Sequence, residues 1–346
     1  MSFMLDEIHE QPTALDRFMA SQRRVVISIA DELKRRKCRF GMIAARGTSD
    51  NAATYGKYIF ELVNGLPVAL AAPSVFTLYN ADLNLSDVMV IGISQSGQAA
   101  DVNICLESAQ AHGALTVGIT NELRSDITKY AKFTIHCDAG KERSVAATKT
   151  YTTSLAALIM LAAEVAENSA LIEKLKNVPS YINGIFSECE QQIKDIAYRI
   201  RDLTDCIVLA RGTNRATAFE TALKMAETCY IKAEAYSSSD FLHGPIAVVD
   251  KGTKCFLFAP EGPSFDNMLE IAEKLVERGA SLIIVSNSEK ILSIANEPVK
   301  IPFDLDDLIS PIVYVVVGQL FANYFAEAKG LDPDHPRGLS KITITR

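Results

Sequence analysis

The chain repeats a short motif, and this repeat constrains its fold more than any other feature of the sequence. Ala-Arg-Gly-Thr-Ser occupies 45–49 and Ala-Arg-Gly-Thr-Asn occupies 210–214, so that Arg46 and Arg211 lie 165 positions apart. Each copy follows an apolar run and precedes a helical pattern. That order is typical of a strand, glycine turn and helix in an α/β phosphate or nucleotide site. The repeat therefore predicts two related α/β halves.

The two halves carry different polar residues. With the same offset, Ser-Gln-Ser-Gly at 94–97 aligns with Ala-Pro-Glu-Gly at 259–262, so the hydroxyl-rich turn belongs to the first half alone. Glu220, Lys224, Glu227 and His243 align with aromatic or apolar residues of the first half. This division indicates a site with one anion-binding end and one acid–base end.

Composition excludes several classes of protein. With 346 residues, 48% hydrophobic and 22% charged, the chain is expected to form two globular domains. The net charge of −7 argues against nucleic acid or an anionic membrane as the main partner. Seven cysteines without a Cys-x-x-Cys pair indicate reduced thiols. The start is too polar for a signal peptide and the apolar runs are too short for a bilayer, so we expect a cytoplasmic protein.

Strand and helix patterns alternate along the chain. The predicted strands are 40–45, 67–70, 88–93, 114–119, 132–136, 206–210, 232–235, 253–259, 281–285 and 298–301. The predicted helices are 13–36, 50–63, 99–111, 149–167, 182–202, 215–230, 264–278 and 309–329. This order predicts parallel sheets with helices on both faces. We expect a helical segment at 1–36, domains at 37–177 and 178–330, and a tail at 331–346 that ends in an extended segment.

The strongest local signal is the turn at 94–97, which follows an apolar strand. Two hydroxyls, the free N–H groups of a helix starting near Gln98 and the permissive backbone of Gly97 suit a phosphate. The alternative is a serine that caps an ordinary helix. The chain has neither a P-loop nor a dinucleotide fingerprint, and its histidines are scattered, so we expect no cofactor and no metal.

The ionisable candidates lie in the second half and the tail. Glu220, Lys224 and Glu227 share one helix face among apolar residues, where they are either a partly buried acid–base cluster or a surface ion pair. His243 lies in a turn suited to proton transfer, or is a solvated loop histidine. Lys341 by itself is a tail lysine, and the threonines at 148 and 150 are possible helix caps.

Six segments, in order, resemble the isomerase half of glucosamine-6-phosphate synthase, a member of the sugar isomerase (SIS) family. They are ARGTSDNAATYGKYIFE, ISQSGQAAD, VAATKTYTT, ALKMAETCYIKAEAY, FLHGP and DPDHPRGLSKITI. The resemblance covers essentially the whole chain. It implies two flavodoxin-like, three-layer α/β/α SIS domains that bind an amino-sugar or ketose phosphate and form a homodimer.

The resemblance also implies roles for individual residues. Glu227, with Lys224 beside it, would move a proton between C1 and C2 of the open sugar. His243 would assist ring opening from the neighbouring subunit, and Lys341 would form a Schiff base with the sugar carbonyl. The implied substrate-binding residues are Thr48, Ser49, Ser94, Gln95, Ser96, Gly97, Val145 and Glu220.

The sequence departs from the family's pattern at several positions. Ala99 and Ala147 stand where hydroxyl residues are expected, and Gln98 stands where an acid is expected. Residue 2 is serine, so we expect no N-terminal cysteine nucleophile and no amide-transfer domain. These changes affect the expected substrate more than the expected reaction.

Our hypothesis is an isomerase-type deaminase that converts an amino-sugar phosphate into a ketose phosphate and ammonia. A fructosamine-phosphate deglycase of the same class is an alternative. So is an isomerising synthase half that uses ammonia or a separate glutaminase. A sugar-phosphate sensor without catalysis is the alternative from another class.

Overall fold

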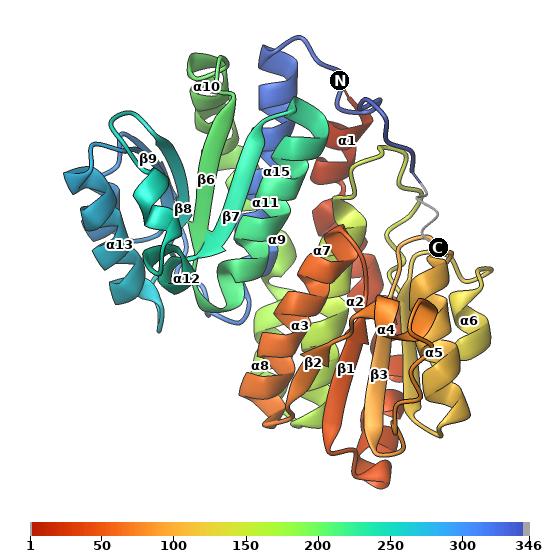
Figure 1. Cartoon of the computed structure of the whole chain (residues 1–346). Coiled ribbons are helices and arrows are strands. Elements are labelled where there is room, and N and C mark those ends of the chain that lie inside the picture. Colours follow the sequence, from red (N-terminus) through yellow and green to blue (C-terminus); the bar gives the residue numbers. More distant parts are fainter. Residues whose placement is uncertain (1, 342–346) are drawn as a thin grey trace. The chain divides into compact units, whose positions relative to one another are not determined.

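The computed structural model describes residues 2–341, which form two compact units with one β-sheet each (Figure 1). The first-sheet unit comprises Glu10–Glu142, Ala147–Asn177 and residues 340–341. The second-sheet unit comprises residues 2–9, Arg143–Ala146 and Val178–Leu339. Each unit therefore includes a short segment that is distant in sequence from the rest of the unit.

The first-sheet unit has five parallel strands in the order β2-β1-β3-β4-β5. They are β1 Phe40–Ala44, β2 Val68–Leu70, β3 Val88–Ile93, β4 Leu115–Thr120 and β5 Phe133–His136. The helices α3 (Thr48–Asn64) and α7 (Lys149–Val165) pack together, and α2 packs on α7. The other helices are α4 Pro73–Thr77, α5 Ala100–Ala111 and α6 Ile127–Tyr130. Apolar residues of α5 and β3, among them Val90, Val102 and Leu106, form a continuous core.

The second-sheet unit repeats this topology with the order β10-β9-β8-β6-β7. Its strands are β6 Asp205–Ala210, β7 Lys232–Ser237, β8 Lys254–Phe258, β9 Ser281–Ser286 and β10 Glu297–Lys300. Its helices include α11 Arg215–Cys229, α12 Ser238–Leu242, α13 Phe265–Glu277, α14 Glu289–Leu292 and α15 Ser310–Ala328. Short 3₁₀ turns follow β6 (Gly212–Asn214) and α12 (Pro245–Val248). Within this unit, α13 covers one face of the sheet and α11 the other (Figure 1). The predicted duplicated α/β fold with parallel sheets is confirmed.

The helices at the start and in the middle of the chain differ from the prediction. The predicted helix 13–36 is α2 (Gln11–Arg36), preceded by a separate short helix, α1 (Phe3–His9). The predicted single helix 182–202 is interrupted at Cys189. The chain there forms α8 (Ser169–Lys176), α9 (Val178–Glu188) and α10 (Glu190–Arg199). Pro179 lies in the first turn of α9, where proline is tolerated because that N–H has no helical partner.

The tail follows the prediction as far as it is described, since residues 331–341 contain neither helix nor strand. The expected extended segment at 342–344 lies outside the described residues. Within residues 2–341, no helix combines the length and apolar character that crossing a membrane requires.

Candidate active site

The turn Ser94–Gly97 leaves the carboxyl end of β3 and is fixed to the next strand. The Ser94 N–H donates to the Ile119 carbonyl, and the Gln95 carbonyl accepts from the Asn121 N–H, both at 3.0 Å. Ser94 is buried, whereas Gln95 and Ser96 are half-buried. Helix α5 begins at Ala100, and its N-cap residue, Ala99, makes no side-chain cap. The interpretation of these serines as ordinary helix caps is therefore wrong.

Gly97 is required by the conformation and packing of the turn. Its φ of 65° is in the left-handed region, and a Cβ there would lie 1.9 Å from the Ser125 hydroxyl oxygen. The Gly97 carbonyl accepts hydrogen bonds from the Ile127 N–H and from Nδ2 of Asn103. Glycine thus packs the turn against the protein's own loop, and this packing fixes the conformation of the two serines.

Thr48 and Ser49 lie in the first turn of α3, directly after β1. The strands β1 and β3 are neighbours, with Ala44 opposite Gly92, so their following loops leave the same edge of the sheet side by side. The sheet order reverses direction here, because the chain runs from β1 to β2 on one side and to β3 on the other. Open α/β sheets bind ligands at such a switch point. The predicted phosphate-binding residues therefore lie at one edge of the sheet. They are Ser94 to Gly97, in the turn after β3, and Thr48 and Ser49, at the start of α3.

The helix α11 holds the predicted acid–base cluster in the second-sheet unit. Lys224 Nζ lies 2.5 Å from Glu227 Oε2 and 3.4 Å from Glu220 Oε1. Glu220 and Lys224 are fully buried, whereas the Glu227 side chain is 24% exposed. Burial alone would lower the pKa of Lys224, but the two carboxylates hold it above its ordinary value. The alternative of a surface ion pair is therefore wrong for Glu220 and Lys224, and Lys224 is a buried cation that positions Glu227.

His243 follows α12 on an exposed loop of the second-sheet unit. Its backbone N–H donates to the Asp240 carbonyl at 3.2 Å. Its exposure fits a solvated histidine in the single chain, and its proposed action on a neighbouring subunit stays a prediction.

Lys341 pairs with Glu142, a buried carboxylate that the sequence patterns did not reveal. Lys341 Nζ lies 2.9 Å from Glu142 Oε2, with side-chain exposures of 26% and 0%. Glu142 also accepts hydrogen bonds from the N–H groups of Thr148 and Thr150 and from the Thr150 hydroxyl, at 2.8–3.1 Å. The threonines expected to cap α7 are therefore donors to Glu142, which performs the capping.

Several interactions act on the Glu142 carboxylate in opposite directions. Burial alone would raise the pKa of Glu142, but Lys341 and the hydrogen-bond donors of the α7 N-terminus hold it below its ordinary value. The ion pair also engages the Lys341 amine. Lys341 must leave Glu142 and lose a proton before it can attack a carbonyl.

Val145 lies in the 143–146 segment of the second-sheet unit and is half-buried. The N–H groups of Arg143 and Ser144 donate to the buried Glu7 carboxylate of α1, the second of these bonds measuring 3.2 Å. This attachment fixes the backbone immediately before Val145.

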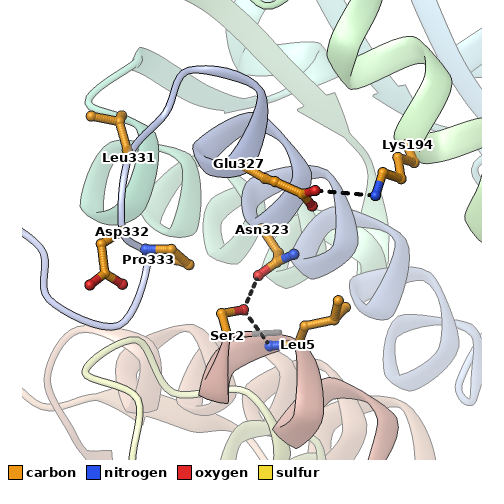
Figure 2. Close-up of a pocket in the computed structure, with 8 residues that line it drawn as sticks. All are labelled: Ser2, Leu5, Lys194, Asn323, Glu327, Leu331, Asp332 and Pro333. Carbon is orange, nitrogen blue, oxygen red and sulfur yellow. Dashed lines mark hydrogen bonds and ion pairs between the residues drawn. The ribbon is translucent and has the colours of Figure 1, made fainter.

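A separate pocket of about 490 Å³ lies among α1, α10, α15 and the tail (Figure 2). Ser2 and Asn323 are hydrogen-bonded in it, and Lys194 and Glu327 form an ion pair. Its lining residues are Ser2, Leu5, Lys194, Asn323, Glu327, Leu331, Asp332 and Pro333. None of the predicted site residues belongs to this set. In the described part of the chain, no group of three His, Cys, Asp or Glu side chains is placed to hold a metal ion.

A family model of the SIS domain matches the chain twice, at residues 36–164 and 200–326. The chain belongs to the SIS-domain family. The two matches coincide with the two sheets, so the internal repeat is a pair of SIS domains.

The SIS pair is similar along its length to larger and to equally long proteins. It is 37% identical to glutamine–fructose-6-phosphate aminotransferase (isomerizing) of Thermococcus kodakarensis, over 99% of this chain and 58% of that one. The chain thus spans little more than half the length of this curated relative. A putative phosphosugar isomerase from Silicibacter pomeroyi superposes with a TM-score of 0.86 at 34% identity, covering 96% of this chain and 100% of that one. The C-terminal domain of glucosamine-fructose-6-phosphate aminotransferase from Francisella tularensis gives 0.85 at 27% identity, covering 97% and 98%.

Proposed function

We propose that the chain is an isomerase-type deaminase that converts glucosamine 6-phosphate, or a related amino-sugar phosphate, into a ketose 6-phosphate and ammonia. Membership of the SIS family and similarity to phosphosugar isomerases support a sugar phosphate as substrate. The observation that carries the proposal is the Glu220–Lys224–Glu227 cluster on α11, in which Glu220 and Lys224 are buried and Glu227 is partly exposed. A partly exposed carboxylate fixed by a buried cation suits the repeated transfer of one proton.

The proposed reaction begins with binding and ring opening. The substrate phosphate binds the turn Ser94–Gly97 and the hydroxyls of Thr48 and Ser49. His243 of a neighbouring subunit assists opening of the sugar ring, which exposes the C1 aldehyde. The phosphate contacts lie far from the bonds that change, so they contribute mainly to binding.

Proton transfer follows ring opening. Glu227 takes the C2 proton, which gives an enaminol, and returns a proton to C1, which leaves an imine at C2. Water adds to this imine and releases ammonia, so the product is a ketose phosphate. General acid–base transfer of this kind contributes about 10²–10⁴-fold in rate. Lys341, once it has left Glu142 and lost a proton, condenses with the C2 carbonyl of the ketose with loss of water, and hydrolysis of this Schiff base releases the product.

A second candidate is the reverse use of the same chemistry, in which ammonia and a ketose phosphate give the amino sugar. The specific observation in its favour is the 37% identity to an isomerising aminotransferase, of which this chain matches 58%. The two candidates share every site residue and differ in the direction of net flux.

One assay separates these possibilities. Ammonia release is measured with a panel of 2-amino-sugar phosphates and fructosamine phosphates, and amino-sugar formation is measured with ketose phosphates and ammonia. Glu227→Gln should retain substrate binding and lose about 10²–10⁴-fold in kcat, because the amide cannot accept the C2 proton. Wild-type turnover by this variant, or no reaction of the wild-type protein with any phosphate of the panel, would reject the proposal.

A further inference from the structure

Arg46 pairs with a buried carboxylate at the start of the helix that follows the phosphate turn. Its Nε lies 2.5 Å from Oδ2 of Asp101, which is in the first turn of α5. The side chains are 51% and 3% exposed. Because Arg46 follows β1 and α5 follows the turn Ser94–Gly97, the ion pair joins the loop after β1 to the start of the helix after the turn, at the switch point of the sheet.

The geometry of this pair leaves part of the guanidinium available. The hydrogen bond and the ion pair of the Arg46 side chain both join its Nε to Oδ2 of Asp101. A guanidinium has five N–H donors in a planar fork, and its two terminal amino groups match two oxygens of a phosphate. Asp101 fixes the side chain in advance, which reduces the conformational entropy that a ligand must offset.

The phosphate turn itself contains no cation. Residues 94–100 are Ser, Gln, Ser, Gly, Gln, Ala and Ala, so a bound dianion would meet only hydroxyls, an amide and backbone N–H groups there. Charge-assisted hydrogen bonds from arginine to phosphate are about twice as strong as neutral ones. Arg46 is the cation that the ion pair brings to the start of α5.

The equivalent arginine of the second half is placed differently. Arg211 uses a terminal amino group, Nη1, which donates to the hydroxyls of Ser237 and Ser239. The turn that aligns with the phosphate turn contains Pro260 and the acidic Glu261. In the second copy the terminal edge of the guanidinium is therefore engaged by serine hydroxyls, and the aligned turn is not suited to an anion.

We infer that Arg46, oriented by Asp101, is a further phosphate-binding residue and determines the preference for phosphorylated substrates. The inference rests on the proposed function, which identifies the anion as a sugar phosphate. Asp101 is a positioning residue in this account, because it acts through Arg46. The competing explanation is an ion pair that only ties a loop to a helix.

Binding is tested first, without turnover. The affinity for inorganic phosphate is measured by calorimetry and by the phosphate-dependent rise in thermal stability. Arg46→Met keeps the apolar stem and should weaken phosphate binding about 10- to 100-fold, the range for a charge-assisted contact. Arg46→Lys should be intermediate, because it keeps the charge and loses the fork. Asp101→Asn should also weaken binding, because Arg46 is no longer held by a charged partner.

Arg23→Met is a matched control for Arg46→Met. Arg23 is also 51% exposed and also pairs through Nε with a carboxylate, Glu164, but it lies on α2. Its loss should leave phosphate affinity unchanged. An equal loss of affinity in both methionine variants would show that losing a positive charge anywhere on the protein weakens phosphate binding, and would overturn the inference.

Kinetics then separate phosphate recognition from a structural role. With glucosamine 6-phosphate, Arg46→Met should raise KM about 10- to 100-fold and change kcat less than about twofold. The KM ratio of variant to wild type should shrink between pH 7.5 and 5.5, because the phosphate monoester gains a proton near pH 6. A purely structural ion pair predicts no such pH dependence.

The outcomes distinguish the inference from the proposed function. Unchanged phosphate affinity and unchanged KM in Arg46→Met would overturn the inference, even if the wild-type protein turns over amino-sugar phosphates. Arg46-dependent phosphate binding by a protein that releases no ammonia from any substrate would reject the proposed function and support the inference.

Discussion

Replacing Glu142 by glutamine tests how much the buried carboxylate contributes to the first-sheet unit. Four donors converge on Glu142: the N–H groups of Thr148 and Thr150, the Thr150 hydroxyl and the Lys341 amine. A glutamine of the same shape would turn an N–H toward some of these donors and would remove the negative charge. The variant therefore changes the charge and the hydrogen bonds at this position and keeps the side-chain volume.

The magnitude follows from the burial of the two partners. Breaking a fully buried ion pair by removing one partner costs about 3–5 kcal/mol. Glu142 is fully buried, but Lys341 is 26% exposed and can turn to water, which favours the lower end of this range. We expect Glu142→Gln to lose about 3 kcal/mol at pH 7, or about 150-fold in the unfolding equilibrium. For a unit of this size, the loss corresponds to roughly 6–12 °C in Tm.

Two measurements can detect this loss. Hydrogen exchange of peptides from α7 reports the opening of the first-sheet unit specifically, and thermal unfolding reports the Tm of each transition. Glu173→Gln on α8 is the control, because Glu173 pairs with Lys176 on the surface of the same unit. This control should behave as the wild type, since exposed ion pairs contribute little.

The pH dependence gives a second check. Folding lowers the pKa of Glu142 below its ordinary value of 4.5, so the carboxylate stabilises the folded state fully above that pH. The contribution is lost as the pH falls through the folded-state pKa. The difference in stability between wild type and Glu142→Gln should thus be constant from pH 7 to about pH 5.5 and should shrink below pH 4.5. A variant as stable as wild type at pH 7, or a difference that grows on acidification, would refute the reasoning.

Three further predictions concern the proposed reaction. Borohydride with substrate should add one sugar phosphate to the peptide that contains Lys341, and an active protein without this adduct would exclude the Schiff base. Mixing inactive Glu227→Gln with inactive His243→Ala should restore part of the activity if His243 acts across a dimer, because hybrid dimers contain one intact site. Absence of recovery after verified subunit exchange would show that each chain builds its site alone. Ser96→Ala should raise KM more than it changes kcat, and a KM unchanged from the wild-type value for every phosphorylated substrate would contradict the phosphate site.

The sequence predicted the fold closely because the information for it is local and duplicated. The spacing of apolar residues in each segment has the period of a strand or of a helix, and these segments alternate along the chain. The internal repeat implies that both halves have the same strand order. The strand β3, predicted at 88–93, is found there. The break at Cys189 was missed because the apolar pattern continues through it, with Ile185 and Ile193 buried on either side.

The site was predictable only where its residues are close in sequence. The cluster on α11 follows from helical spacing, and its burial follows from its apolar neighbours. Glu142 could not be found in this way, because its partner Lys341 is 199 positions away. An acidic residue shortly before a helix is a recognisable capping signal, and it was the one cue available for Glu142. The pairing of Arg46 with Asp101 depends in the same way on strand neighbours that only the topology reveals.

The exchange of segments between the two units has a consequence for biosynthesis. A ribosome makes the chain from its N-terminus at about 5–20 residues per second, and domains generally fold as they emerge. The first-sheet unit cannot follow this order completely, because residues 340–341 belong to it and are made after the whole second sheet. The second-sheet unit has the opposite delay, since residues 2–9 are made long before α15, the helix on which they pack. A nascent chain that stalls before residue 341 would thus present a folded first sheet without the amine that the proposed chemistry requires.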